Sequence, residues 1–288
     1  MDTNFAADSP PPAASTASHQ PAATLGLWDA VSIIVGIIIG VGIFETPPQV
    51  FDQVARPGMA LTTWILGGAL ALVGALCFAE LASAYPRSGG EYVYLTRAFG
   101  PLTGFLFAWS QLTVTRSGSV AALAYIFGSR AAQLFEFDHN AVFLLAGLAL
   151  AVLTLINIVG VRMGTGTQHI LTLAKVLGLA ALIIVGLGWG RSDIVEHVQP
   201  EARPSGWFAG AMILVLWTYS GWHEAAYIVA EAKNRTRNIP LALIIGTSTV
   251  TLIYVLVNIA FLTGLDFADA RTERAAEKLI SLAWPGYG

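Results

Sequence analysis

The sequence predicts an all-α protein that crosses a membrane several times, and its composition and its long apolar stretches predict this together. Hydrophobic residues make up 55% of the 288 residues, charged residues make up 11%, and the mean hydropathy is +0.66. Soluble domains usually carry about 25% charged residues, so this chain could not cover a soluble globule with polar groups. A soluble enzyme is therefore excluded.

Seven stretches are apolar enough to form membrane helices, each of which needs about 20 residues. The transmembrane domain is expected over residues 26–264, preceded by a disordered tail (1–25) that is rich in Pro, Ala and Ser and followed by a polar extramembrane segment (265–288). A basic cluster at 233–237 favours a cytoplasmic N-terminus in a cell-membrane protein. The expected spans are 27–50, 59–83, 101–127, 141–159, 168–190, 207–230 and 239–264.

Cysteine usage and charge exclude further classes of protein. The single cysteine, Cys77, cannot form a disulfide framework or a multi-cysteine metal site. The net charge of −3 provides no basic surface for nucleic acid. The sequence contains no H-E-x-x-H and no G-x-S-x-G motif, so we expect neither a membrane-embedded enzyme nor a bound metal or cofactor.

The first span contains closely spaced glycines at about its middle. Gly36 and Gly40 form a G-x-x-x-G pattern, which is typical of close helix packing. Gly40, Val41 and Gly42 are also typical of a helix that unwinds and exposes backbone N–H and C=O groups to a cavity. The sequence pattern is compatible with both interpretations.

The sixth span contains a polar run, residues 218–224 (TYSGWHE), in an otherwise apolar stretch. Polar residues at this depth usually face a cavity. Two shorter helices or an interfacial turn, with Trp222 as a membrane-interface anchor, are the alternatives. The two interrupted spans are five spans apart and cross the membrane in opposite directions, as in an inverted repeat of five helices (about 26–190, then 207–264).

Three stretches resemble the amino acid–polyamine–organocation superfamily, and its L-type amino acid transporter branch in particular. Residues 38–44 (IIGVGIF) are similar to the helix 1 signature, and residues 75–109 are similar to the helix 2 to helix 3 region. Residues 219–222 (YSGW), Glu231 and 234–240 (NRTRNIP) resemble the helix 6 break and the motif after it. Val41 stands where the family usually has a small residue, and Arg235 where Pro is common.

The resemblance implies a broken-helix transporter fold of two inverted five-helix repeats, truncated after about seven helices. It implies an amino acid permease that works by alternating access, through exchange or proton symport. The alternative is a nontransporting membrane module that needs a partner chain or its missing C-terminal helices. The substrate would be an amino acid as a small molecule, held at Gly40, Val41, Gly42, Trp217, Thr218, Ser220 and His223.

The resemblance also implies a role for Lys175 in the fifth span. Its ammonium would replace a sodium ion, bind the helix 1 backbone near the break and couple transport to a proton; the alternative is a lysine that reaches the cytoplasmic interface. Arg116 in the third span is costly in lipid, and is expected to pair with Glu45 or Glu224 or to line water. Structural pairs are expected between Glu80 and Arg87, and between Glu231 and Arg235 or Arg237.

Overall fold

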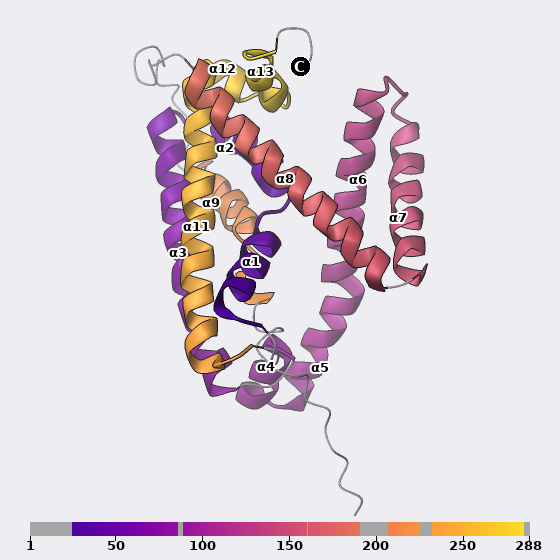
Figure 1. The fold of residues 1–288 in the computed structure, drawn as a ribbon, viewed down its shortest axis with the longest axis vertical. Coiled ribbons are helices and arrows are strands. Elements are labelled where there is room, and N and C mark those ends of the chain that lie inside the picture. The colour runs from indigo at the N-terminus through magenta and orange to yellow at the C-terminus, as the bar shows by residue number, and fades with distance from the viewer. Residues whose placement is uncertain (1–24, 86–88, 160, 191–206, 225–231, 285–288) are drawn as a thin grey trace, which may run out of the picture.

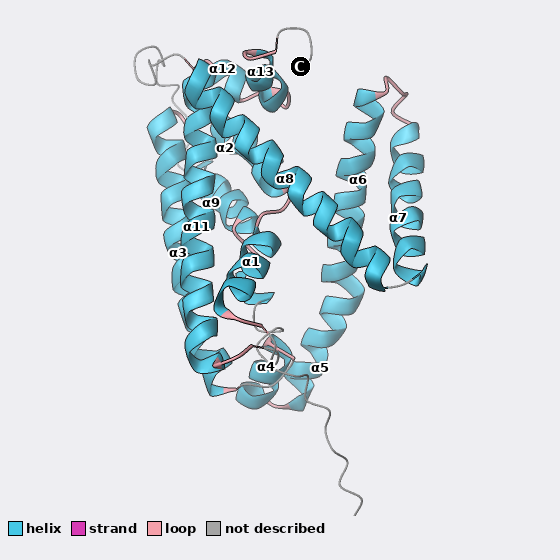
Figure 2. Ribbon diagram, viewed as in Figure 1, coloured by secondary structure: helices cyan, strands magenta, loops and turns pink. Residues whose placement is uncertain are grey.

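The computed structural model describes residues 25–85, 89–159, 161–190, 207–224 and 232–284, which form helices joined by short connections (Figures 1 and 2). The described residues form no strand, and an isolated bridge between Leu25 and Ala232 is their only β-type pairing. The predicted all-α class is therefore confirmed. Along the chain the elements are α1 (Leu27–Ile38), α2 (Gly42–Gln53), α3 (Pro57–Ala84), α4 (Glu91–Phe99), α5 (Pro101–Ser110), the π-helix η1 (Gln111–Thr115), α6 (Arg116–Leu134), α7 (Ala141–Val159), α8 (Val161–Trp189), α9 (Trp207–Thr218), the 3₁₀ turn η2 (Trp222–Glu224), α11 (Arg235–Gly264), α12 (Phe267–Ala270) and α13 (Ala275–Ser281).

Four of these helices contain a segment long and apolar enough to cross a membrane: α3, α7, α8 and α11. The pair α1 and α2 meets the same criterion as one span bent by 50°. The expected third span, 101–127, corresponds to α5, η1 and α6, which follow one another without a gap to Leu134. Of the expected sixth span, 207–230, the structure describes α9 and η2, and residues 225–230 lie outside the described residues.

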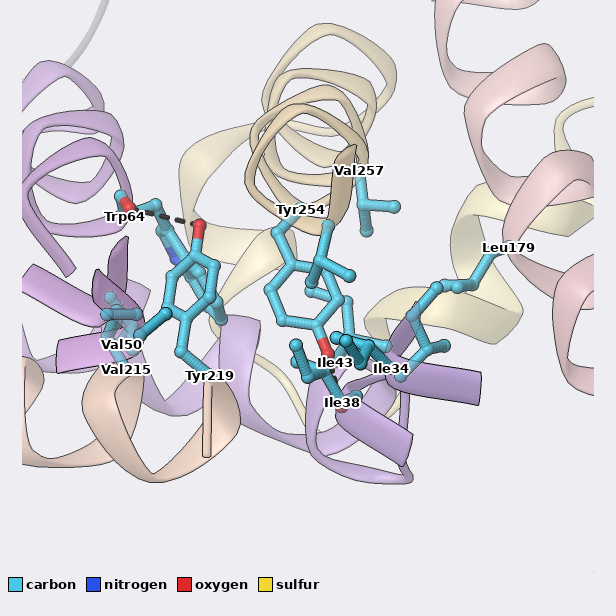
Figure 3. Close-up of a cluster of buried hydrophobic side chains, with 14 of the residues drawn as sticks. Ile34, Ile38, Ile43, Val50, Trp64, Leu179, Val215, Tyr219, Tyr254 and Val257 are labelled. Carbon is cyan, nitrogen blue, oxygen red and sulfur yellow. Dashed lines mark hydrogen bonds between the residues drawn. The ribbon is translucent and has the colours of Figure 1, made fainter. Parts of the chain in front are cut away.

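The core lies between α1, α2, α3, α9 and α11. Two adjacent glycines, Gly67 and Gly68, allow α9 and α11 to approach α3, because a Cβ atom at either position would overlap Val215 or Thr251. Aromatic rings fill the centre of this group: the centroid of Tyr219 lies 5.9 Å from that of Trp64 and 5.0 Å from that of Tyr254 (Figure 3). The broken helices are thus anchored to a rigid, aromatic core.

The hairpin of α6 and α7 stands apart from this core, and α8 crosses diagonally between them (Figure 1). α8 contacts α7 near one end of its path and packs along α11. The surfaces of α6 and α7 carry many exposed apolar side chains, including Phe127, Phe143 and Leu144, as expected of helices in a membrane.

Two regions contain helices where the sequence suggested none. α4 forms within the connection between the second and third spans. In the C-terminal segment, α12 and α13 pack back on the bundle: Leu279 is fully buried, and the Arg271 guanidinium donates to the carbonyls of Phe51 and Val54 at 3.2 and 3.3 Å. This segment therefore covers the end of α2, and its expected extramembrane position remains a prediction.

Candidate functional site at two helix breaks

The first break separates α1 from α2 at residues 39–41. Ile39 has an extended conformation (φ −71°, ψ 90°), and helical geometry resumes at Gly42. The predicted interruption of the first span is therefore confirmed. Among the described residues, nothing lies within 4 Å of a Cβ atom added at Gly36, so this part of the structure shows no close helix packing at that glycine. Unwinding leaves the last carbonyls of α1 and the first N–H groups of α2 without helical partners.

Lys175 of α8 binds the end of α1. Its Nζ atom donates to the carbonyl oxygens of Gly36 at 2.8 Å and Ile39 at 2.6 Å. A cation at a helix C-terminus complements the negative end of the helix dipole. The contact with helix 1 that the resemblance implied for Lys175 is present, and the lysine does not extend toward the interface instead.

Tyr254 of α11 joins the two breaks, a role that was not predicted from the sequence. Its hydroxyl lies 2.9 Å from the carbonyl oxygen of Ile38 at the end of α1 (Figure 3). The same hydroxyl lies 3.4 Å from the carbonyl oxygen of Thr218 at the end of α9. The residue is fully buried. A lone phenol in the middle of an apolar span was the only available signal.

The second break follows α9, and its glycine packs against the first break. Gly221 has φ +115°, which favours glycine, and an added Cβ atom would lie 3.1 Å from Ile37 Cγ2. Trp222 packs edge-on against Phe78 of α3, with ring centroids 5.1 Å apart. Trp222 is therefore packed against the core while partly exposed, and its interpretation as an interface anchor remains a prediction.

Gly42 and Thr218 are brought together, but in a contact between protein atoms. An added Cβ atom on Gly42 would lie 3.1 Å from Thr218 Cγ2. Thr218 is buried, and its hydroxyl lies 2.9 Å from both Thr46 Oγ1 and the Leu214 carbonyl. Gly42 therefore permits the close approach of α2 to α9, and the Thr218 side chain links the two helices.

The other predicted contact residues are more accessible. Gly40 and Val41 are partly exposed, and an added Cβ atom on Gly40 would have no neighbour closer than 4.0 Å. Trp217 and Ser220 are exposed. His223 is partly exposed, and its Nε2 atom lies 4.0 Å from Glu91 Oε1. These residues are therefore accessible at the level of the breaks.

Each break is followed, three residues after its glycine, by a glutamate that pairs with α6. Glu224 binds Arg116, with 2.7 Å between Oε1 and Nη1. Glu45 binds Arg130 through both carboxylate oxygens. Of the two partners expected for Arg116, the structure shows Glu224. Glu45 pairs instead with Arg130, a partner that was not predicted from the sequence.

Two cavities flank the first break. One of about 610 Å³ lies on the α2 side, where Glu45, Asp52 and Arg130 line it together with Arg271. The other, of about 670 Å³, lies on the α1 side, where Gly36, Asn157 and Lys175 line it. Among the described residues, no cluster of histidine, cysteine and carboxylate side chains could hold a metal ion.

The predicted structural pairs are only partly described. Glu80 lies exposed on α3, and its expected partner Arg87 is outside the described residues. Glu231 is also outside them, while Arg237 is exposed in the first turn of α11. Both pairs remain predictions.

Comparison with known proteins identifies the family. The family profile described as amino acid permease matches residues 25–279. The b(0,+)-type amino acid transporter 1 of Mus musculus is 38% identical over 247 residues, covering 83% of this chain and 51% of that protein. The serine/threonine exchanger SteT of Bacillus subtilis is 34% identical over 238 residues, covering 83% and 54%.

A third relative, the large neutral amino acids transporter small subunit 2 of Mus musculus, is 35% identical over 277 residues, covering 90% of this chain and 52% of that protein. The chain thus spans about half the length of the curated relatives it matches. The family match covers the two helix breaks and most of the described helices. The chain is a membrane protein and belongs to the amino acid permease family.

Proposed function

We propose that this chain forms the half of an amino acid permease that contains both helix breaks, and that an α-amino acid binds between them. The observation that carries this proposal is the meeting of the breaks: Gly221 lies against the end of α1, and Tyr254 reaches the last carbonyls of α1 and α9. Backbone N–H groups, with partial positive charge, and carbonyl groups, with partial negative charge, therefore lie at the same level of the bundle.

The substrate carboxylate would bind the first N–H groups of α2. These groups lack helical partners and lie at the positive end of the helix dipole, so they suit a carboxylate without a charged side chain. Open space at Gly40 supports this position, since a side chain there would stand between the ligand and the backbone.

The substrate ammonium would bind carbonyl groups at the end of α9. The corresponding carbonyls of α1 accept short hydrogen bonds, Gly36 and Ile39 from Lys175 and Ile38 from Tyr254. The Thr218 carbonyl at the end of α9 accepts a longer one, 3.4 Å, from the Tyr254 hydroxyl. Trp217 would cover the ligand, and Ser220 and His223 would contact its side chain. The bound amino acid would thus be held across the two breaks, as in broken-helix transporters.

Transport would proceed by alternating access, through exchange or proton symport. Lys175 supports independence from sodium, since its ammonium already neutralises the end of α1. The names of the relatives, which include an exchanger, support exchange. We infer that the N-terminus is cytoplasmic and that the chain resides in the cell membrane, on the evidence of the basic cluster at 233–237.

Further helices or a partner chain complete the transporter in this proposal. The chain spans about half of its relatives, and one of them is named a small subunit. The second candidate function, a nontransporting membrane module, also rests on the observation that the chain spans about half the length of its relatives. The two candidates differ in whether the chain alone binds an amino acid.

Ligand binding by the purified chain in lipid nanodiscs tests the proposal. A panel of radiolabelled amino acids is expected to contain at least one ligand, bound equally in sodium and in choline buffer. Gly40→Val is expected to abolish binding without lowering the unfolding temperature, because the new side chain enters open space. Gly147→Val, at an open position on α7, is the matched control and should bind normally. Absence of any ligand for the parent chain would favour the module.

A further inference from the structure

The cavity on the α2 side extends along one face of α2, from the first break toward the end of that helix. Its volume is about 610 Å³; Phe44 and Glu45 line it next to the break, and Asp52 and Gln53 line it at the far end of α2. Because a helix rises about 1.5 Å per residue, this wall is about 14 Å long. The cavity therefore reaches from the level of the break to the end of α2.

Two other parts of the chain form the remaining walls of this cavity. α6 lines it over residues 125–133, and the connection between α12 and α13 lines it with Arg271 and Glu273. Arg271 is bound to α2 itself, since its guanidinium donates to the carbonyls of Phe51 and Val54. The C-terminal wall is therefore attached to α2, whereas the wall formed by α6 belongs to the α6–α7 hairpin.

One ion pair crosses this cavity from α2 to α6. Arg130 Nε donates to Glu45 Oε1 at 2.8 Å, and Arg130 Nη2 donates to Glu45 Oε2. Gln133, three residues further along α6, accepts from Arg130 Nη1 at 3.1 Å and helps to hold the guanidinium in this direction. α2 packs on α9, α3 and α12, whereas α6 packs on α7 in the hairpin that stands apart from the core (Figure 1). The pair therefore links two parts of the molecule that have different packing partners.

The ion pair narrows the cavity on the side of the break. Glu45 is in the first turn of α2, and Ile126, which also lines the cavity, lies on the same face of α6 as Arg130 but one turn before it. A ligand that enters at the end of α2 thus meets the pair before it reaches Ile126 and the break. The two side chains remain partly exposed, so water can replace their mutual hydrogen bonds when the pair opens.

We propose that this cavity is the route by which an amino acid reaches the two breaks from the side on which α2 ends, and that the Glu45–Arg130 pair is the gate on this route. This inference rests on the proposed amino acid binding. Charged groups of both signs line the route, which suits a ligand that carries both an ammonium and a carboxylate. Because the pair forms both with and without a bound ligand, it controls the rates of binding and release and leaves the equilibrium affinity unchanged.

Cysteine labelling without any ligand tests the gate on the full chain in nanodiscs, in a background with Cys77→Ser. Ile126→Cys, which lies beyond the pair, should react about fivefold faster when Glu45→Gln removes the pair, a factor that follows from the modest stability of a partly exposed ion pair. Anionic and cationic methanethiosulfonate reagents should both react faster, so that the altered charge does not account for the result. Glu273→Cys, at the exposed rim of the cavity, should react at the same rate with and without the pair.

Binding kinetics test the route, with the radiolabelled amino acid that the parent chain binds in the panel described above. Glu45→Gln should raise the association and dissociation rates by the same factor, about fivefold, and leave the affinity unchanged. The charge-reversed double variant, Glu45→Arg with Arg130→Glu, rebuilds a pair and should restore the slow rates. Arg116→Gln is the matched control, because it removes an arginine–glutamate pair of the same helix that lines neither of the two cavities, and it should leave both rates unchanged.

The outcomes distinguish this inference from the proposed function. A parent chain that binds no amino acid overturns both. A parent chain that binds an amino acid, but in which Ile126→Cys reacts no faster without the pair, overturns the gate alone. Unequal changes in the two rates also overturn it, because a changed affinity would show that the pair contacts the ligand or supports its site. Faster labelling of Ile126→Cys together with an equal acceleration of binding and release would establish the gate.

Discussion

Replacing Lys175 by methionine removes the cation that binds the end of α1 while keeping a side chain of similar length. The ammonium donates to two carbonyl oxygens, at 2.8 and 2.6 Å, at the point where the helix unwinds. Leaving a buried acceptor unsatisfied costs about 1–3 kcal/mol. Lys175 borders a cavity, so water can replace part of the lost bonding, and the lower end of that range applies to each carbonyl.

The expected loss is therefore about 2–3 kcal/mol for the two carbonyls together. For chains of 150–250 residues, each kcal/mol lowers the unfolding temperature by about 2–4 °C. Lys175→Met should thus unfold about 4–12 °C below the parent chain. Amino acid binding should weaken as well, because the first break borders the proposed ligand position. Lys175→Arg should also bind poorly, since the larger planar guanidinium does not fit the place of an ammonium.

Thermal unfolding of the purified variants in nanodiscs, without ligand, measures the first effect. Lys233→Met is the matched control, because it removes a positive charge from an exposed side chain and should leave the unfolding temperature unchanged. Binding in sodium and in choline measures the second effect. A methionine variant that unfolds and binds like the parent, or a parent whose binding sodium stimulates, would refute the assigned role of Lys175.

The remaining predictions concern topology and the first break. In a chain with Cys77→Ser, cysteines introduced at Phe5 and Asn234 should both react only from the cytoplasmic side, because spans one to six make an even number of crossings; labelling of either from outside would contradict the orientation. Gly42→Val should lower both the unfolding temperature and amino acid binding, since its Cβ atom would press on Thr218. A Gly42→Val variant as stable as Gly40→Val in the same thermal assay would disprove the close contact.

The positions of both helix breaks could be predicted from the sequence, because they depend on local chemistry. Closely spaced glycines in a β-branched apolar run and a polar run inside an apolar span both favour the interruption of a regular helix. The contact of Lys175 with the helix 1 backbone could be predicted for a similar reason, because a cation within a membrane span needs a hydrogen-bond acceptor. The unwound end of a neighbouring helix supplies such acceptors.

The contacts between distant segments could not be predicted in the same way. Tyr254 lies more than 200 residues from Ile38, and nothing in its own span shows that its hydroxyl meets the end of α1. Thr218 is polar and stands at a break, which suggested a ligand contact, but the close approach of α2 directs its hydroxyl to Thr46. Such pairings depend on how the helices pack, and they cannot be predicted from a single sequence.

Two glutamates, each in the turn that follows a helix break, pair with arginines of α6. Glu45 follows Gly42 by three residues, and Glu224 follows Gly221 by three residues, so both lie in the first turn after a break. Both pair with an arginine of the same helix. The two arginines are 14 residues apart, about 21 Å along the helix. One helix therefore ties together the first turns that follow the two breaks, and the two ion pairs fix how far apart these turns lie.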